Sequence, residues 1–181
     1  ANVYQLPFVA GAFDGAMMVR VLHHLAEAPR ALTEICRVLQ TGGTFVLEFA
    51  NKRNLKSMLR YALGRQSWNP YDLTPVEFVA LNFDFHPRAV RQWLGEAGFS
   101  VQRQRAVSHF RLGLLKRSLP TGLLVAADAL LQPTGNWLQF SPSVFVQAKV
   151  TAQHAPTLAE SIFCCPTCGS WASASRSLLP I

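Results

Sequence analysis

The sequence predicts an α/β fold built around a parallel sheet. Two short apolar segments, residues 15–22 and 44–49, flank an amphipathic helical segment at residues 29–39. A strand, a helix and a second strand in this order are typical of a βαβ unit, because parallel strands need a crossover that usually contains a helix. A further apolar segment at residues 143–150 predicts a strand that closes the domain.

Each part of the βαβ unit has its own signal. The apolar run at residues 15–22 is interrupted only by Arg20 and is typical of a strand buried on both faces. Pro29 suits the first turn of a helix. Apolar side chains then recur at helical spacing at Ala31, Leu32, Ile35, Val38 and Leu39. We expect Gly42 and Gly43 to end this helix, since glycine readily adopts the left-handed conformation of a helix cap.

The region from residue 51 to residue 85 differs in character from the βαβ unit. A helix is expected at residues 55–63, with an apolar face surrounded by Lys and Arg side chains. Residues 66–75 are turn-rich and aromatic. Because loops on a rigid scaffold often carry function, we expect residues 51–85 to form a cap-like insertion over an active site.

The remaining elements follow in order. A helix is predicted to begin at Pro87 and to end at Gly98, and residues 99–107 alternate as a strand does. Residues 109–131 are apolar with basic flanks and predict one or two helices.

Composition bounds the class of protein. The chain has 181 residues, of which 50% are hydrophobic and 15% are charged, so one folded domain with a small appendage is expected. The net charge of +7 would attract nucleic acid, anionic lipid or acidic substrates, although a solvated basic surface is the simpler interpretation. Residues 119–131 are too short to span a membrane and include Asp128. With no signal peptide and few cysteines, a cytoplasmic location is expected.

The first 49 residues carry the most specific motifs. The segment with Asn2, Val3, Leu6 and Pro7 is followed by FDGAMMVRVLHHL and later by TGGTFVLEF. This pattern resembles the class I S-adenosylmethionine-dependent methyltransferases, in the branch that methylates small molecules, lipids and quinones. The resemblance extends more weakly to residue 150. It implies a Rossmann-like α/β/α fold of three layers, with a mostly parallel sheet and an antiparallel last strand.

The resemblance also implies which residues contact the cofactor. Asn2 stands where the family has an acid that accepts from the adenine amino group, and its amide oxygen can still accept. The matching cofactor-binding positions are Asn2, Val3, Leu6, Pro7, Arg20, Val21, Leu22 and His23. Without the residues that follow, Leu6 and Pro7 would be an ordinary hydrophobic turn. His23 and His24 are candidate general bases, since histidine titrates near neutral pH. Alternatively, one of them packs where the helix begins.

The family's first strand and its glycine-rich loop, which holds the carboxyl end of the cofactor, have no counterpart in this sequence. We therefore expect residues 1–150 to be the C-terminal portion of a longer methyltransferase domain, with a degenerate relative of the family as the alternative. By itself the chain should bind S-adenosylmethionine weakly.

Three of the four cysteines lie near the C-terminus. Cys165 and Cys168, in the sequence CPTCG, have the spacing of one half of a zinc site, and Cys164 is a third candidate ligand. We expect residues 151–160 to be a linker and residues 161–181 to be a partial zinc-ribbon-like tail. An unliganded cysteine loop is the alternative. Cys36 is expected to be a buried apolar residue.

The function that these features predict is S-adenosylmethionine-dependent methyl transfer to a small-molecule or lipid-like acceptor. Alignment of the two reactants supplies much of the rate of such a reaction, so no single residue type marks the site. The alternatives are a basic protein that binds or modifies RNA and a non-catalytic zinc-knuckle interaction module. The basic helices could contact RNA or an anionic membrane surface, and no obligate protein partner is expected.

Overall fold

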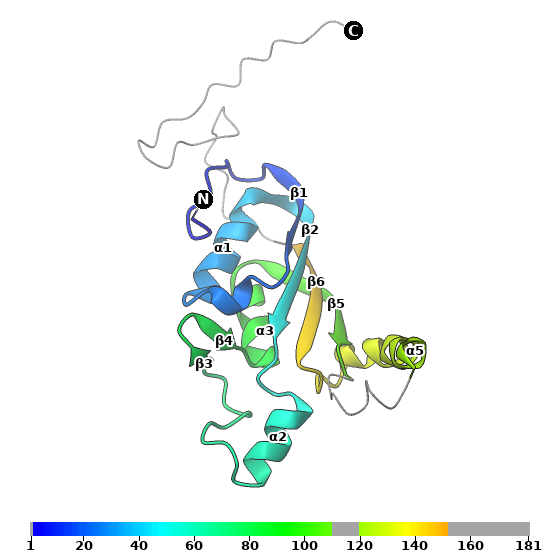
Figure 1. Cartoon of the computed structure of the whole chain (residues 1–181). Helices are drawn as coiled ribbons and strands as arrows, with labels where there is room; N and C mark the ends of the chain where they lie inside the picture. The colour runs from blue at the N-terminus through cyan, green and yellow to red at the C-terminus, as the bar shows by residue number, and fades with distance from the viewer. Residues whose placement is uncertain (1, 110–119, 152–181) are drawn as a thin grey trace, which may run out of the picture.

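A four-stranded mixed sheet forms the centre of the molecule (Figure 1). The computed structural model describes residues 2–109 and 120–151. The sheet contains β1 (Phe13–Met18), β2 (Leu39–Ala50), β5 (Phe99–Val107) and β6 (Ser143–Val150), in the order β1-β2-β6-β5. β1 is parallel to β2, whereas β6 is antiparallel to both of its neighbours. The strands predicted at residues 99–107 and 143–150, and the antiparallel last strand, are confirmed.

Two helices cover one face of this sheet. α1 (Ala28–Val38) connects β1 to β2, and α3 (Pro87–Glu96) precedes β5. Both bury apolar side chains against the same set of strand residues, and this burial is the main stabilising contribution to the fold. The largest fully buried apolar side chains are Phe45, Phe49, Phe85, Leu22, Leu32, Leu39, Leu47, Leu94, Val90 and Val144. Cys36 is buried as expected, and burial raises its pKa.

The opposite face of the sheet is much more open in the described part of the chain. One row across the four strands pairs Met17 with Val46, Val46 with Gln147, and Gln147 with Arg103. Met17 is 74% exposed, and Gln147 and Arg103 are also exposed. The prediction that residues 15–22 form a strand buried on both faces is therefore wrong. The strand ends at Met18, and α1 and α3 cover only one of its faces.

The predicted helix end at Gly42 and Gly43 is also wrong. α1 ends at Val38, because Leu39 already has extended backbone angles and begins β2. Gly42 does have a positive φ of 80°, but it lies inside β2. Gly43 is also required sterically, since a Cβ there would lie 2.7 Å from the carbonyl oxygen of Gln40.

Residues 51–85 fold into α2 (Leu55–Ala62) and a hairpin of β3 (Val76–Val79) and β4 (Asn82–Asp84). Backbone hydrogen bonds from Phe85 N to Ala50 O and from Lys52 N to Phe85 O attach the end of the hairpin to the end of β2. The hairpin therefore lies beside the carboxyl end of β2, to the left of the sheet in Figure 1. The role of this segment as a cap stays a prediction.

A helical segment protects the outer edge of β5. α5 (Thr121–Leu131) continues into a 3₁₀ helix, η2 (Gln132–Asn136). The Asn136 side-chain oxygen accepts a hydrogen bond from Gln104 N, which satisfies part of an otherwise free strand edge. Gly135 allows this contact, since a Cβ there would lie 2.3 Å from Ala106 N. Of the helices predicted at residues 109–131, the structure describes α5.

His86 caps the N-terminus of α3. We expect its titration to make the free energy of unfolding depend on pH. It is 3% exposed, and its Nδ1 accepts from Arg88 N at 3.1 Å. Burial, followed by the positive charge of Arg53, lowers the pKa of His86 from 6.5 to about 4. The unfolded chain therefore binds the extra proton first as the pH falls. We expect this residue to remove about 3 kcal/mol of stability as the pH falls from its unfolded pKa of 6.5 to its folded pKa of about 4.

The replacement His86→Asn keeps a capping oxygen and removes the titration. Urea unfolding of the variant and the wild type across the acid range checks this prediction. Parallel pH curves for the two proteins would contradict it.

Candidate functional site at the carboxyl ends of β1 and β2

A cavity of about 370 Å³ opens at the carboxyl ends of β1 and β2. Ligands of open α/β sheets bind beyond this edge, so its position alone makes it a candidate site. The β3–β4 hairpin closes one side, and the turns next to β5 and β6 close another. Its polar and charged lining residues are Arg20, His23, Glu48, Asn82, Asp84, Ser108 and Ser143.

Glu48 holds the turn that follows β1. It is 8% exposed, and its Oε2 accepts from Arg20 N at 2.9 Å. Its Oε1 accepts a short hydrogen bond from the Ser143 hydroxyl. Arg20 has a positive φ of 57°, which is uncommon for a side chain other than glycine. Glu48 therefore works as a structural anchor, and both of its oxygens are occupied.

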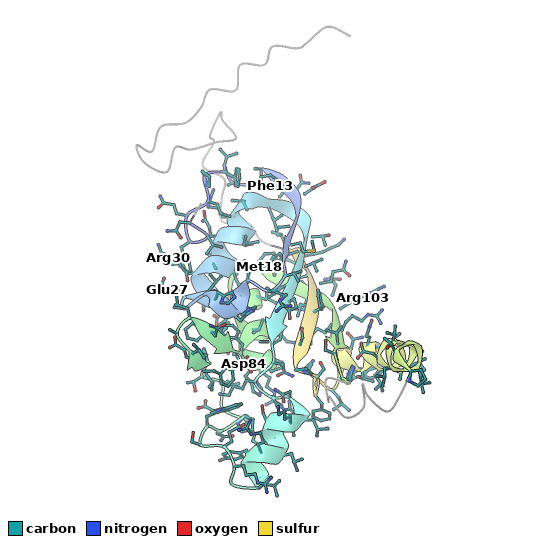
Figure 2. All side chains as sticks on the ribbon, in the orientation of Figure 1. Phe13, Met18, Glu27, Arg30, Asp84 and Arg103 are labelled. Carbon is teal, nitrogen blue, oxygen red and sulfur yellow. The ribbon has the colours of Figure 1, made fainter. Side chains whose placement is uncertain are left out.

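Asp84 is the second acid of the cavity, and its surroundings differ from those of Glu48. It is the last residue of β4, at the side of the hairpin that is near the end of β2 (Figure 2). Burial raises the pKa of Asp84 from 3.8 to about 6. None of the described residues donates a hydrogen bond to its carboxylate.

His23 and His24 are adjacent but occupy different environments. Both belong to a 3₁₀ turn, η1 (Leu22–His24). His23 lines the cavity, and its pKa is lowered mainly by burial and then by the neighbouring His24. It is therefore neutral at neutral pH. His24 is exposed, and its Nδ1 lies 3.0 Å from Leu81 O in the turn of the hairpin. Because a carbonyl only accepts, this nitrogen must donate, and His24 ties η1 to the hairpin.

Because His24 is hydrogen-bonded to Leu81 O in the hairpin, we expect the substitution His24→Phe to have a local effect. The aromatic ring is kept while the hydrogen bond to Leu81 O is lost, at a cost of about 1 kcal/mol. We expect faster amide hydrogen exchange in β3 and β4 and little change in global stability, because opening is local. Unchanged exchange of these amides would show that the hydrogen bond from His24 to Leu81 O does not stabilise the hairpin.

The structure brings only some of the predicted cofactor residues together. Arg20 and His23 line the cavity, and Val21 is 40% exposed beside them. The Leu22 side chain is fully buried in the core instead of lining the cavity.

The N-terminal motif lies on α1 and does not line the cavity. Two charged side chains of α1 hold it. Glu34 accepts from Leu6 N at 2.7 Å, and Arg37 donates to the carbonyl oxygens of Leu6 and Phe8. Asn2 is exposed, and its side-chain oxygen accepts from Tyr4 N. None of Asn2, Val3, Leu6 and Pro7 is among the lining residues. Their contact with a cofactor stays a prediction.

Two residues of the cavity were not predicted from the sequence, although each carries a signal. Glu48 is an acid inside the apolar strand FVLEFA, and Asp84 is an acid between two phenylalanines. An acidic residue in such a setting must be paired or must titrate abnormally. The cysteines Cys164, Cys165 and Cys168 lie outside the described residues. Within residues 2–109 and 120–151, no group of three metal-ligating side chains gathers, and no helix is long and apolar enough to cross a membrane.

A second hollow of about 650 Å³ adjoins the cavity, and Phe78 and Pro142 line both. Its walls are mainly apolar, and two cations of α2, Lys56 and Arg60, belong to them. The apolar side chains that line it are Leu55, Leu59, Trp68, Phe78, Phe140 and Pro142. We call this hollow the α2 groove. Leu55 and Leu59 are 63% and 58% exposed, so the apolar face predicted for residues 55–63 is open to this groove.

The N-terminal part of the chain, which contains β1 and most of β2, is similar to known methyltransferases. A family model described as a methyltransferase domain matches residues 1–47. The demethylmenaquinone methyltransferase of Symbiobacterium thermophilum is 43% identical over 51 residues, which are 28% of this chain and 20% of that protein. The chain thus spans only a fifth of the length of this curated relative.

Solved structures match over more of the chain. An S-adenosylmethionine-dependent methyltransferase from Thermotoga maritima has a TM-score of 0.51 and 17% identity, over 83% of this chain and 62% of that one. A second, from Mesorhizobium loti, has a TM-score of 0.52 and 17% identity, over 82% of this chain and 67% of that one. The chain therefore has the Rossmann-like α/β fold of the class I S-adenosylmethionine-dependent methyltransferases, with a partial sheet.

Proposed function

We propose that this chain takes part in S-adenosylmethionine-dependent methyl transfer and that the cavity at the ends of β1 and β2 holds the reacting end of the acceptor. One observation carries the proposal. The polar cavity lies at the carboxyl ends of β1 and β2, and the matched methyltransferase segment, residues 1–47, contains β1 and most of β2. When bound, the cofactor supplies an electrophilic methyl group on sulfur.

The described residues fit one wall of a cofactor site. The turn after β1 presents the exposed Val21 side chain and the Arg20 backbone, which Glu48 fixes in place. We propose that Arg20, Val21 and His23 border the methionine part of the cofactor, and that the Leu22 side chain supports this turn from the core. Asn2 would offer its amide oxygen to the adenine, although that oxygen now accepts from Tyr4 N.

The α2 groove supports a lipid-like acceptor. The groove and the polar cavity share two lining residues, Phe78 and Pro142, so one amphipathic molecule could place a polar end in the cavity and an apolar tail in the groove. Each buried methylene of such a tail contributes about 0.8 kcal/mol. Lys56 and Arg60 beside the groove would favour an anionic membrane surface as the source of the acceptor. Lys52 cannot contribute, because it is 1% exposed and donates to Thr74 O.

His23 has a binding role in this proposal. Its neutral imidazole faces the cavity and can exchange a hydrogen bond with the reacting group of the acceptor. Orientation of this kind contributes to the rate by holding the nucleophile in line with the transferred methyl group. His24 would act indirectly, by keeping the hairpin over the cavity.

Calorimetric titration tests whether the protein binds the cofactor. S-adenosylhomocysteine is titrated into the full-length gene product. We expect binding and a weaker affinity for Val21→Asp, which puts a charge on the turn. The exposed Asp14, at the other end of β1, supplies the control Asp14→Asn. Absence of binding by the wild type would contradict the proposal and favour salt-dependent RNA binding.

A pair of alkylphenol probes, one with a short and one with a long chain, tests the groove. Leu59→Ser should weaken binding of the long-chain probe and leave the short-chain probe unaffected, because only the long chain reaches the groove. An equal loss for both probes would remove the groove from the proposal.

A further inference from the structure

We propose that Asp84 is a catalytic residue that accepts the proton of an O–H or N–H nucleophile during methyl transfer. This inference rests on the proposed function and adds to it the chemical class of the acceptor. The acceptor would carry a neutral hydroxyl or amine-type N–H that must lose a proton, and not a group that is already ionised.

The fold aims Asp84 into the cavity. Along β4 and the residue after it, side chains alternate between the two sides of the strand. Phe83 and Phe85 lie on one side, where their rings stack at 6.2 Å. Phe85 belongs to the core, whereas Phe83 packs against the core and also borders the cavity. Asp84, between them, is on the other side and lines the cavity. Because Phe85 is 1% exposed and is bonded to Ala50 O, the position of Asp84 is fixed relative to the end of β2.

Of the other acids and bases of the cavity, Glu48 is already engaged and His23 is less basic than an ordinary imidazole. Both oxygens of Glu48 accept hydrogen bonds, from Arg20 N and the Ser143 hydroxyl. The imidazole of His23 is made less basic by burial and by the charges of His24 and Arg20. The Asp84 carboxylate has no hydrogen bond or ion pair with any residue that the structure describes. It is therefore the free carboxylate of the site.

The environment also suits Asp84 to this task. The charged or titratable groups that line the cavity with it are Arg20 from the turn after β1, His23 from η1 and Glu48 from β2. Burial raises the pKa of Asp84 to about 6, so the carboxylate is ionised at neutral pH and more basic than an ordinary one. A general base works best when its pKa is close to the working pH.

Methyl transfer with Asp84 as the base needs two reactants, the acceptor and the sulfonium methyl donor. The acceptor oxygen or nitrogen forms a bond to the methyl carbon as the sulfur–carbon bond breaks, and that electron pair remains on sulfur. The proton of the acceptor passes to the Asp84 carboxylate. The products are the methylated acceptor, the neutral thioether and a protonated Asp84, which then releases its proton to solvent.

Methyl transfer to an alkylphenol and to its nitro-substituted counterpart tests the inference. With the alkylphenol, Asp84→Asn should lower kcat/KM by about 10²- to 10⁴-fold. The wild-type profile should fall on the acid side near pH 6. His23→Gln should be slower but keep this acid limb. With the nitrophenol at an alkaline pH where it is ionised, Asp84→Asn should keep the wild-type rate. Equal loss with both probes, or an unchanged acid limb in Asp84→Asn, would overturn the proposal.

Carbon NMR of the aspartate carboxyl groups gives a readout that needs no turnover. The Asp84 resonance, assigned by its absence in Asp84→Asn, should shift when the alkylphenol binds, whereas that of Asp14 should not. An unperturbed Asp84 resonance at saturating probe would show that Asp84 does not face the acceptor. Failure to bind S-adenosylhomocysteine would instead contradict the proposed function, so the two failures are distinguishable.

Discussion

The variant Asp84→Asn is expected to be more stable than the wild type at neutral pH, by about 2 to 3 kcal/mol. The reason is that burial raises the pKa of Asp84 from 3.8 to about 6. The folded state therefore binds a proton more tightly than the unfolded chain does. The stability that belongs to the protonated form is fully present below the unfolded pKa and is lost as the pH rises through the folded one. An asparagine amide has the shape of the carboxyl group and never ionises.

Urea unfolding of the two proteins at about pH 4 and about pH 8 measures this difference. The gain should be large at the higher pH and small at the lower one. His86 changes the stability in the opposite direction over an overlapping range, so the comparison must be between variant and wild type and not along one wild-type curve. Asp14→Asn, at an exposed position, controls for a general effect of removing one negative charge. A less stable Asp84→Asn would mean that the ionised carboxylate has a partner in the folded protein.

This stability result bears on function. Asp84 lines the candidate site, and its ionised form lowers the free energy of unfolding. Active sites are where such residues concentrate, because chemistry needs groups with shifted pKa values. Higher stability together with a loss of methyl transfer in one variant would therefore support a catalytic role.

The second large effect is expected for Leu22→Asp. Leu22 is fully buried in the core cluster, where an unpaired carboxylate is very costly. We expect a loss of more than about 4 kcal/mol, which is enough to unfold many domains. S-adenosylhomocysteine binding should disappear with the fold and not for a reason local to the cofactor site.

Circular dichroism and thermal unfolding separate these two causes. Leu22→Met conserves volume and should stay within about 1.5 kcal/mol of the wild type. Val21→Asp, at the exposed neighbouring position, should keep the fold and weaken S-adenosylhomocysteine binding. A Leu22→Asp protein that keeps its Tm but loses the ligand would show that this side chain lines the cofactor site.

Local sequence determined most of the regular elements. α1, α3, β5 and β6 follow from periodicity, and the start of α3 follows from Pro87, because such signals act within a few residues. The end of α1 did not follow from the two glycines after it, because these lie inside β2. Arg20 and His23 could be assigned to a site because the strand before them ends at the sheet edge where ligands bind.

Only the tertiary structure decided which side chains meet. Leu22 and His23 are adjacent in sequence, yet one lies in the core and the other lines the cavity, because η1 turns the chain after β1. Asp84 and Glu48 line the same cavity because backbone hydrogen bonds attach the end of the hairpin to the end of β2. The exposure of Met17 depends on which face α1 and α3 cover. Local patterns set the shape of each element, but burial and pKa depend on neighbours that are distant in the sequence, so they appear only when the chain is folded.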